Sequence, residues 1–303
     1  MASHLAIVNP AAGGGACGKR APAVLARLRD AGLTIDVRET TSAGEAERIA
    51  RDSYAKGQRD FIAVGGDGTS FEVVNGLFGG VDLSTRGSED TPHLGLLPLG
   101  TGNSFLRDFS ENGTEHAIDS LIRGRTRACD VIRISHPDGQ LHFINILSIG
   151  FVADVGDLRN RRFSAFGELG YILGVILKTA ALHTYRFPMR IDGGELDSGE
   201  TTFLSFNNSR FTGGKMEMAP AADTGDGLLD IIRVGALSRL SLLQTFPKIF
   251  KGTHVESPAV TTFQAKSVDF EIPAKVPCMI DGEMIDLQPT RLEVLPGALR
   301  IRA

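Results

Sequence analysis

Asp67 stands in a glycine-rich stretch that follows an apolar run and precedes a helical pattern. The sequence around it reads "FIAVGGDGTSFEVVNGL", residues 61–77. Glycines at a strand-to-helix turn let the backbone approach a phosphate, and the first N–H groups of the helix are oriented donors. A carboxylate beside phosphate is repulsive unless it holds magnesium or takes a proton from a nucleophile. The stretch therefore predicts phosphate chemistry, with a tight turn capped by Asp67 as the structural alternative.

Two more glycine-rich loops follow apolar runs of the same kind. One is "NPAAGGG", residues 9–15, and the other lies in "LGLLPLGTGNSFLRD", residues 94–108. In a parallel sheet such loops gather at the carboxyl ends of the strands, where ligands bind. Each loop alone is equally consistent with an ordinary connection, but the three together predict a nucleotide site along one edge.

The first loop also comes close to a P-loop. Gly13, Gly18 and Lys19 fit the frame G-x-x-x-x-G-K, but Arg20 stands where the frame needs Ser or Thr. The hydroxyl of that residue coordinates magnesium, which a guanidinium cannot do. We interpret the match as accidental, with Lys19 and Arg20 either adding positive charge or forming a solvated first helical turn.

Two acidic stretches occur late in the chain, "AADTGDGLLD" (residues 221–230) and "IDGEMIDL" (residues 280–287). Asp226-Gly227, taken alone, is typical of a turn before a strand. Asp281-Gly282 lies between two strand-like runs and predicts a hairpin turn. A tight turn is also a rigid place to hold a catalytic carboxylate, so both interpretations of Asp281 can be true.

The elements that would carry these loops change character along the chain. Up to about residue 130, short apolar runs alternate with helical stretches, including one after Asp67 that places Phe71, Val74 and Leu77 on one face. That alternation predicts an α/β domain with a parallel sheet. The later part has many strands, such as "LHFINILSIGF" (residues 141–151), and one long helical stripe over residues 166–180. It predicts a mainly antiparallel, sandwich-like domain.

These patterns give domain limits of 1–130 and 131–303, with residues about 290–303 packing back on the first domain. The 303 residues are enough for two cores, and the 42% of hydrophobic residues is ordinary for a globular chain. A formal charge of −4 argues against nucleic acid as the main partner. Three widely spaced cysteines give no disulfide framework or zinc pattern, which fits a cytoplasmic protein.

The N-terminus has no charged segment followed by a long apolar stretch, so we expect no signal peptide. The most apolar later stretch, residues 170–182, is interrupted by Lys178 and is too short to span a bilayer. We therefore expect no transmembrane segment.

Taken in order, "NPAAGGG", "GGDGTSFEVVNGL" and "PLGTGNSF" resemble the diacylglycerol kinase catalytic family, which includes bacterial lipid kinases, sphingosine kinases and ceramide kinases. "FINILSIGFVADV", "DTGDGLLDIIRV" and "IDGEMI" are similar to the second domain of that family. The resemblance covers nearly the whole chain. It implies an α/β nucleotide domain, like that of NAD kinases and diacylglycerol kinases, followed by a mainly antiparallel β-sandwich.

The resemblance implies a kinase that uses ATP and Mg²⁺ to phosphorylate the primary hydroxyl of a membrane lipid, which is diacylglycerol, ceramide or a sphingoid base. The positions that match nucleotide contacts are Asn9, Pro10, Ala11, Ala12, Gly13, Thr40, Gly66, Asp67, Gly68, Thr69, Ser70, Phe71, Glu72 and Thr101.

Carboxylates take the remaining implied roles. Asp67 would lie nearest the phosphates and magnesium, and Asp281 would accept the proton of the lipid hydroxyl, with Glu283 beside it. A second metal position is matched by Asp226 with Gly227, and its further oxygens would come from the backbone. The residues implied as metal ligands are Asp223, Asp226 and Leu228.

Three departures from the family pattern leave alternatives open. Ser104 replaces a usual Asp, Phe71 replaces a usual Asn, and Ala11 and Ala12 replace a Ser-containing pair. The loss at Ser104 puts the metal arrangement in doubt. Alternatives are an NAD kinase-like phosphotransferase, which shares "GGDG", and a nucleotide-binding sensor without catalysis.

The implied partner is a lipid at a membrane surface, with peripheral association and no nucleic acid. A homodimer stays open. An apolar stripe over residues 163–185, preceded by Arg159, Arg161 and Arg162, is the expected membrane-facing edge.

Overall fold

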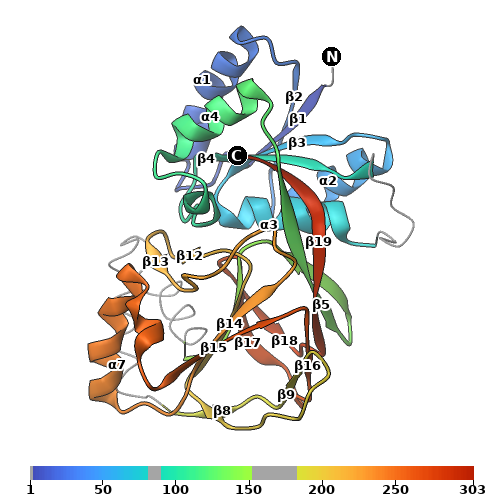
Figure 1. The fold of residues 1–303 in the computed structure, drawn as a ribbon. Helices are drawn as coiled ribbons and strands as arrows, with labels where there is room; N and C mark the ends of the chain where they lie inside the picture. Colours follow the sequence, from blue (N-terminus) through green and yellow to red (C-terminus); the bar gives the residue numbers. More distant parts are fainter. Residues whose placement is uncertain (1–2, 81–89, 152–182) are drawn as a thin grey trace. The chain divides into compact units, whose positions relative to one another are not determined.

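The computed structural model describes residues 3–80, 90–151 and 183–303 (Figure 1). Contacts within the chain divide it into two units. The first unit comprises Met1–Val131, Leu141–Ile144 and Leu295–Ala303, and the second comprises Ile132–Gln140 and Asn145–Val294. The helix expected over residues 166–180 and the three arginines of the expected membrane-facing edge lie outside the described residues.

The first unit is an α/β domain built on a parallel sheet. Its strands lie in the order β2-β1-β3-β4, and the end of β19 (Arg291–Arg302) pairs in parallel with β4. These strands are β1 (His4–Val8), β2 (Ile35–Glu39), β3 (Asp60–Gly65) and β4 (His93–Pro98). The helices that connect them are α1 (Ala16–Asp30), α2 (Glu45–Ala55), α3 (Asp67–Phe78) and α4 (Gly113–Arg123), with a 3₁₀ turn η3 (Phe105–Asp108) before α4.

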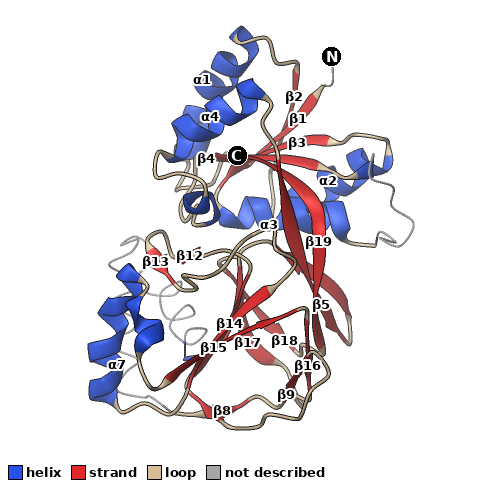
Figure 2. Cartoon of the chain, viewed as in Figure 1, coloured by secondary structure: helices blue, strands red, loops and turns tan. Residues whose placement is uncertain are grey.

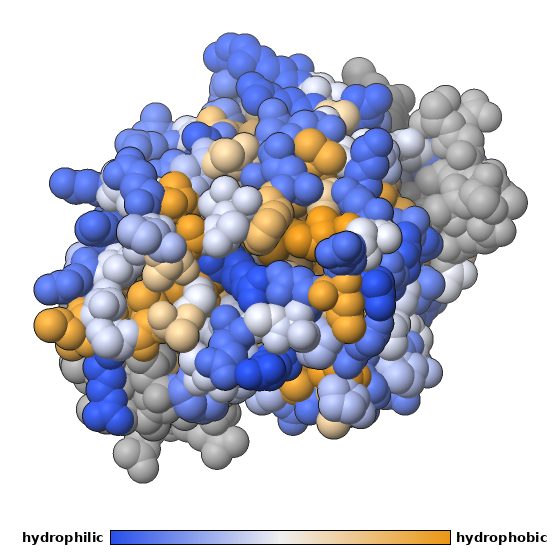
Figure 3. Space-filling model, turned by 60° about the horizontal axis from the view of Figure 1, so that its bottom comes forward, coloured by the Kyte–Doolittle hydropathy of each residue, from blue (hydrophilic) through white to orange (hydrophobic). Residues whose placement is uncertain are grey.

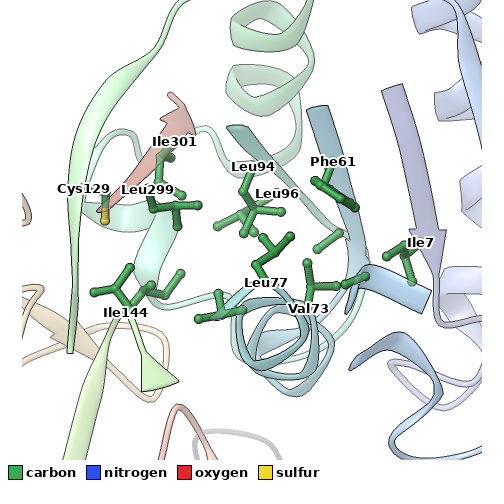
Figure 4. Packing of buried hydrophobic residues seen from close by; sticks show 14 of the residues in the cluster. Ile7, Phe61, Val73, Leu77, Leu94, Leu96, Cys129, Ile144, Leu299 and Ile301 are labelled. Atoms are coloured by element: carbon green, nitrogen blue, oxygen red, sulfur yellow. The ribbon is translucent and has the colours of Figure 1, made fainter. Parts of the chain in front are cut away.

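Helices cover both faces of this sheet, and the side chains of each strand alternate between them. Ala6 packs in the core with α1 and α4, whereas Leu5 and Ile7 pack with α2 and α3. Figure 4 shows the second of these cores, where Val73 and Leu77 of α3 lie against residues of several strands. The period of two along the strands and of 3.6 along the helices therefore sorts the apolar residues into two layers, as the sequence predicts.

Asn75 of α3 ties this helix to a segment far away in the sequence. Its Nδ2 donates to the carbonyl oxygens of Phe71 and His142, and its Oδ1 accepts the N–H of His142 at 2.8 Å. The side chain is 4% exposed. Because it satisfies both backbone groups of His142, it holds residues Leu141–Ile144 in the first unit as a neighbouring strand would.

The C-terminus is anchored by an ion pair. Arg302 Nη2 donates to Asp60 Oδ1 at 2.5 Å, and His93 Nδ1 lies 3.1 Å from the same oxygen. Burial opposes ionisation of Asp60, but the hydrogen bonds from Arg302 and His93 outweigh it and lower the pKa of the carboxyl. The last residues of the chain therefore belong to the first unit by charge as well as by strand pairing.

The second unit is antiparallel. Its larger sheet has the order β15-β14-β11-β7-β17-β18, and all its pairs are antiparallel. The second layer contains β9 (Met189–Ile191) and β16 (Ser267–Phe270). β16 pairs with β9 on one side and with the beginning of β19 on the other. The strands of the larger sheet are β7 (Ile146–Gly150), β11 (Phe203–Asn207), β14 (Leu229–Val234), β15 (Val260–Ala265), β17 (Val276–Ile280) and β18 (Glu283–Leu287). The predicted α/β class followed by an antiparallel β-sandwich is confirmed (Figure 2).

The remaining strands are short or run between the two units. β5 (Arg127–His136) pairs with β19 and with β6 (Gly139–Phe143). β8 (Tyr185–Arg186) pairs with β10 (Glu200–Thr201), and β12 (Phe211–Thr212) pairs with β13 (Met216–Glu217).

Two features of the second unit differ from expectation. The strand expected over residues 141–151 is interrupted between β6 and β7, because the N–H groups of Asn145 and Ile146 donate to the Asp281 carboxylate. A helical run not foreseen from the sequence joins β14 to β15. It comprises α7 (Arg239–Thr245) and the 3₁₀ helices η6 (Phe246–Lys251) and η7 (Thr253–Glu256). No helix within the described ranges is long and apolar enough to cross a membrane.

The bridge made by Asn75 can be tested by stability. Replacing Asn75 by Ala leaves both backbone groups of His142 buried without these partners, so we expect the free energy of unfolding to fall by about 2 to 4 kcal/mol. Urea titration followed by circular dichroism measures it. Asn112→Ala is the matched control, since Asn112 is exposed and its side chain caps nothing. An equal effect of both variants would contradict the bridging role.

Candidate functional site

Three glycine-rich loops meet at the carboxyl ends of β1, β3 and β4. The N–H of Asn9, just after β1, donates to the carbonyl of Val64 at 3.0 Å. The N–H of Gly100, after β4, donates to the carbonyl of Gly65 at 2.8 Å. A Cβ placed on Gly13 would lie 3.4 Å from the Cα of Gly100. The structure therefore brings the three predicted loops together.

The loops touch through backbone, which leaves no room for side chains. A Cβ on Gly100 would lie 2.6 Å from the nitrogen of Gly66, and a Cβ on Gly66 would collide with the carbonyl of Thr101. Gly102 has φ +90°, and its Cβ would collide with the Asp67 carboxylate. Glycine is required here for close approach of the backbone, as expected for a phosphate-binding turn.

The resemblance to a P-loop frame has a packing explanation. Gly18 lies in α1, and a Cβ there would be 3.1 Å from both the Cβ and the carbonyl oxygen of Pro10. The side chains of Lys19 and Arg20 are exposed on the first turn of the helix. Gly18 thus allows α1 to pack on its own loop.

Asp67 is the first residue of α3 and is half-buried. Its Oδ2 lies 3.5 Å from the backbone nitrogen of Ser104. The preceding residue, Gly66, offers no side chain to cap the helix. The N–H groups of Thr69 and Ser70 donate to the carbonyl of Gly66 at 3.0 and 3.2 Å. The start of a helix is favourable for negative charge, so this helix end, with Asp67 at its edge, is of the kind that binds an anionic ligand.

Other predicted nucleotide contacts differ in exposure. Thr101 is exposed, whereas Thr40 is buried and its N–H donates to the carbonyl of Val8 at 2.8 Å. Glu72 uses both carboxylate oxygens on the N–H groups of Gly44 and Ala46, at 2.8 and 3.1 Å. It therefore holds the N-terminus of α2.

Phe71 is 8% exposed, and its carbonyl oxygen accepts Asn75 Nδ2. The other predicted contacts lie in the loop after β1 or in the first turn of α3: Pro10, Ala11, Ala12, Gly68, Thr69 and Ser70.

Asp281 lies in the second unit, at the turn between β17 and β18. Ile280 pairs with Glu283, and Asp281 and Gly282 both have positive φ, 45° and 90°. The predicted hairpin turn is confirmed. Asp281 Oδ1 accepts the N–H groups of Asn145 and Ile146 at 3.1 and 2.9 Å, and the residue is 3% exposed. Two backbone donors and a tight turn therefore fix the carboxylate at the start of β7.

A row of buried polar side chains, which the sequence reading missed, runs across the same sheet. Ser205 of β11 pairs with Ser148 of β7, and Asn207 of β11 pairs with Asp230 of β14. Residues two apart along a strand share a face, so these four residues, named here the polar row, lie on one face. Asn207 Nδ2 donates to Ser205 Oγ and to the carbonyl of Asp230. The only signal in the sequence is the polar alternation in "FLSFNN".

Within the described chain, three side-chain atoms of the polar row have no hydrogen-bond partner. Ser148 Oγ, Asn207 Oδ1 and Asp230 Oδ2 are buried without a partner there. Unpaired buried polar atoms cost about 1 to 3 kcal/mol each. Such a concentration is typical of a site that a ligand completes.

The same face continues into an apolar pocket of about 70 Å³. Phe203 precedes Ser205 by two residues, and Val234 pairs with Phe203, so both share the face of the polar row. The helical run after β14 supplies the outer wall. The lining residues are Phe151, Thr202, Phe203, Met218, Val234, Leu237, Leu242, Thr245, Phe246, Ile249, His254 and Val260.

The loop before β14 carries the predicted metal ligands. Asp223 Oδ1 accepts the N–H of Gly225 at 3.0 Å, and Asp226 Oδ1 accepts the N–H of Leu228 at 2.9 Å. Both aspartates are exposed. The pKa of nearby Asp230 is raised to about 6, mainly by burial, with a smaller contribution from the charges of Asp226 and Asp223 and an opposing hydrogen bond from Gln264.

This loop is better suited to a divalent cation that keeps part of its water shell than to one surrounded entirely by protein ligands. Its negative potential is apparent from the effect of Asp223 and Asp226 on Asp230. Among the described residues, no group of three or more His, Cys, Asp or Glu side chains is arranged to hold a metal. Mg²⁺ keeps several waters and needs only one or two protein carboxylates, so Asp223 and Asp226 are compatible with it.

The predicted residues thus form two groups, one in each unit. The comparisons with known proteins agree with the two-part organisation. A family model described as the diacylglycerol kinase catalytic domain matches residues 3–134, and one described as the YegS C-terminal NAD kinase beta sandwich-like domain matches residues 145–303.

Similar proteins cover almost the whole chain. A diacylglycerol kinase of Mycobacterium tuberculosis (strain CDC 1551 / Oshkosh) is 32% identical over 299 residues, 98% of this chain and 93% of that protein. A probable lipid kinase YegS-like of Cronobacter sakazakii is 32% identical over 280 residues, 91% and 88% of the two chains. A solved structure from Bacillus anthracis str. Sterne has a TM-score of 0.78 at 25% identity and covers 99% of this chain and 96% of that one.

The raised pKa of Asp230 predicts a pH-dependent stability in the metal-free protein. The folded state holds the proton more tightly than the unfolded state, whose pKa is near 3.8. The stabilisation is complete below pH about 4 and is lost as the pH rises through about 6. Between pH 4 and 7, the unfolding free energy of the wild type should therefore fall by up to about 3 kcal/mol more than that of Asp230→Asn.

Urea titrations in EDTA at several pH values measure this difference. Asp286→Asn is the control, because Asp286 is an exposed carboxylate of β18. Its curve should run parallel to that of the wild type. If the unfolding free energy of Asp230→Asn depends on pH as that of the wild type does, Asp230 does not bind its proton more tightly in the folded state.

Proposed function

The chain belongs to the family of bacterial lipid kinases that includes diacylglycerol kinases and YegS-type proteins, and we propose that it transfers the γ-phosphoryl group of ATP to the primary hydroxyl of a membrane lipid. One observation carries the acceptor part of the proposal. Asp281, the polar row and the apolar pocket follow one another along β7 and β11 of a single sheet. This order matches a molecule with a hydroxyl, polar linkages and a long chain.

The distances along the strands support this assignment. Asn207 pairs with Ile146, beside Asp281, and Phe203 of the pocket lies four residues further along β11. Four residues of a strand span about 13 Å. A lipid placed along this face would have its hydroxyl at Asp281, its ester or amide groups at Ser148 and Ser205, and its chain in the pocket.

The first unit supports binding of the nucleotide. The three glycine-rich loops approach one another through backbone, and the residue before α3 is a glycine without a side chain to cap the helix. Oriented backbone donors of this kind suit the phosphates of ATP. We assign Asn9 through Gly13, Gly66 through Ser70 and Thr101 to phosphate and ribose contacts, with Thr40, Phe71 and Glu72 shaping the surroundings.

Magnesium is the second expected cofactor. Asp67 would hold it near the phosphates, and Asp223, Asp226 and the backbone of Leu228 would hold a further ion. When bound, magnesium neutralises charge on the phosphate oxygens.

We assign proton transfer to Asp281. The hydroxyl of the acceptor gives its proton to the carboxylate, its oxygen bonds to the γ-phosphorus, and the bond from that phosphorus to the bridging oxygen breaks, which releases ADP. The N–H groups of Asn145 and Ile146 keep the carboxylate oriented during this step. Phosphoryl transfer needs positioning and charge neutralisation more than a strong base, so a held carboxylate suffices.

The acceptor itself is tested by a panel. Diacylglycerol comes first, since a relative that is 32% identical is named a diacylglycerol kinase. Purified protein with labelled ATP and magnesium should phosphorylate one or more of diacylglycerol, ceramide and sphingosine, as read by thin-layer chromatography. Phosphorylation of NAD alone would overturn the proposal, and so would retained ATP binding with no product.

The role of Asp281 is tested by Asp281→Asn. We expect kcat to fall about 10²- to 10⁴-fold, because the amide cannot accept the proton. ATP binding, measured by calorimetry, should persist, since that site is assigned to other residues. Asp286→Asn serves as the control because this exposed carboxylate lies on the next strand. Undiminished turnover by Asp281→Asn would remove the mechanism.

The pocket is tested by filling it. Thr245 lines the pocket from α7 and is partly exposed, so Phe can be introduced there with little strain. Thr245→Phe should lower kcat/KM for a long-chain acceptor about tenfold, and less for a short-chain acceptor. The control is Thr261→Phe, an exposed site on β15 that does not line the pocket. Equal losses for both chain lengths would show that this pocket does not hold the chain.

A further inference from the structure

The helical run between β14 and β15 exposes large apolar side chains that the pocket does not use. Leu240 is 66% exposed, Leu243 is 43% exposed and Phe250 is 38% exposed. In the described chain, the other strongly exposed large hydrophobic residues are Ile122 and Leu196, which belong to distant segments. Exposed apolar groups that gather on one short segment are typical of an interaction surface.

The segment has two faces with different environments. Leu242, Thr245, Phe246 and Ile249 recur at helical spacing and line the pocket. Leu240 and Leu243 are offset from them and exposed, and Phe250 is partly exposed with its ring packed edge to face on that of Phe246. One side of α7 and η6 therefore forms the wall of the proposed acyl-chain pocket, and the opposite side forms a surface, named here the docking face.

Charge distinguishes this surface from the rest of the protein. Arg239, Lys248 and Lys251 are exposed on the same segment, and none forms an ion pair with a described residue. The sequence has no Asp or Glu between Arg233 and Glu256, although the whole chain carries a formal charge of −4. On the face that Figure 3 draws, hydrophobic residues are interspersed among hydrophilic ones.

We propose that the docking face binds anionic lipid bilayers, with Leu240, Leu243 and Phe250 inserted among the acyl chains and Arg239, Lys248 and Lys251 at the headgroups. An interfacial helix gains affinity from buried apolar area and from attraction between basic residues and anionic lipid. The absence of acidic residues fits this partner. The inference rests on the proposed function, because a lipid kinase must take its acceptor from a bilayer into a pocket.

Sedimentation with vesicles tests the proposal without any turnover. Full-length protein is mixed with vesicles of phosphatidylcholine alone or with phosphatidylglycerol added. We expect binding that increases with phosphatidylglycerol and falls with salt. The variant Leu240→Gln/Leu243→Gln should bind the anionic vesicles about tenfold less well. The control is Ile122→Gln/Leu196→Gln, which removes two exposed apolar residues elsewhere and should bind as the wild type does.

A second readout separates docking from catalysis. Leu240→Gln/Leu243→Gln should keep wild-type kcat on a short-chain, monomeric acceptor and lose activity on long-chain acceptor in vesicles. If Leu240→Gln/Leu243→Gln loses vesicle binding but neither it nor the wild type has kinase activity, the proposed function is overturned and the docking face is not.

Two results would overturn the docking face itself. One is unchanged vesicle binding by Leu240→Gln/Leu243→Gln. The other is a wild type that is a dimer by light scattering and a variant that is a monomer but still binds vesicles. That result would assign the surface to contact with a second copy of the chain. Charge reversal at Lys248 and Lys251 is the independent variant, and it should remove the preference for phosphatidylglycerol.

Discussion

No side chain fits between the ends of β3 and β4. Gly66 and Gly100 touch through backbone atoms, and the carbonyl of Thr101 and the carboxylate of Asp67 occupy the space that Cβ atoms would need. The approach aligns the loop after β4 with the first turn of α3. A glycine turn that leads into a helix N-terminus is of the kind that binds an anionic group, so this edge of the first unit suits an anionic ligand.

The second unit depends on a different constraint, which is the alternation of side chains across its larger sheet. One face carries apolar residues such as Leu204 and Phe206 of β11, whereas the other changes from polar to apolar along β11, from Asn207 to Phe203. A buried polar row is unfavourable for folding by itself, since its unpaired atoms lose their hydration. The acceptor proposed above, with polar linkages and an apolar chain, would give these atoms partners.

Charge has separate roles in the two units. In the first, Arg302 stabilises the ionised form of Asp60 and fixes the C-terminus. In the second, Asp223 and Asp226 add to the effect of burial on Asp230, which shifts that carboxyl towards its neutral form. A cation at the loop would remove part of this repulsion. The basic docking face lies on the next connection along the chain, where acidic residues are missing.

The sequence by itself determined the fold class, the glycine-rich loops and the hairpin at Asp281, because period, glycine spacing and the Asp-Gly pair are local properties of the chain. Only the tertiary structure decided that Glu72 serves the N-terminus of α2, that Asn75 pairs with His142, and that Asp281 interrupts the strand expected over residues 141–151. The polar row and the two faces of α7 could not be recognised from the sequence alone either. Each depends on partners distant in the sequence, and a local pattern carries no information about which distant group satisfies a polar atom or covers an apolar one.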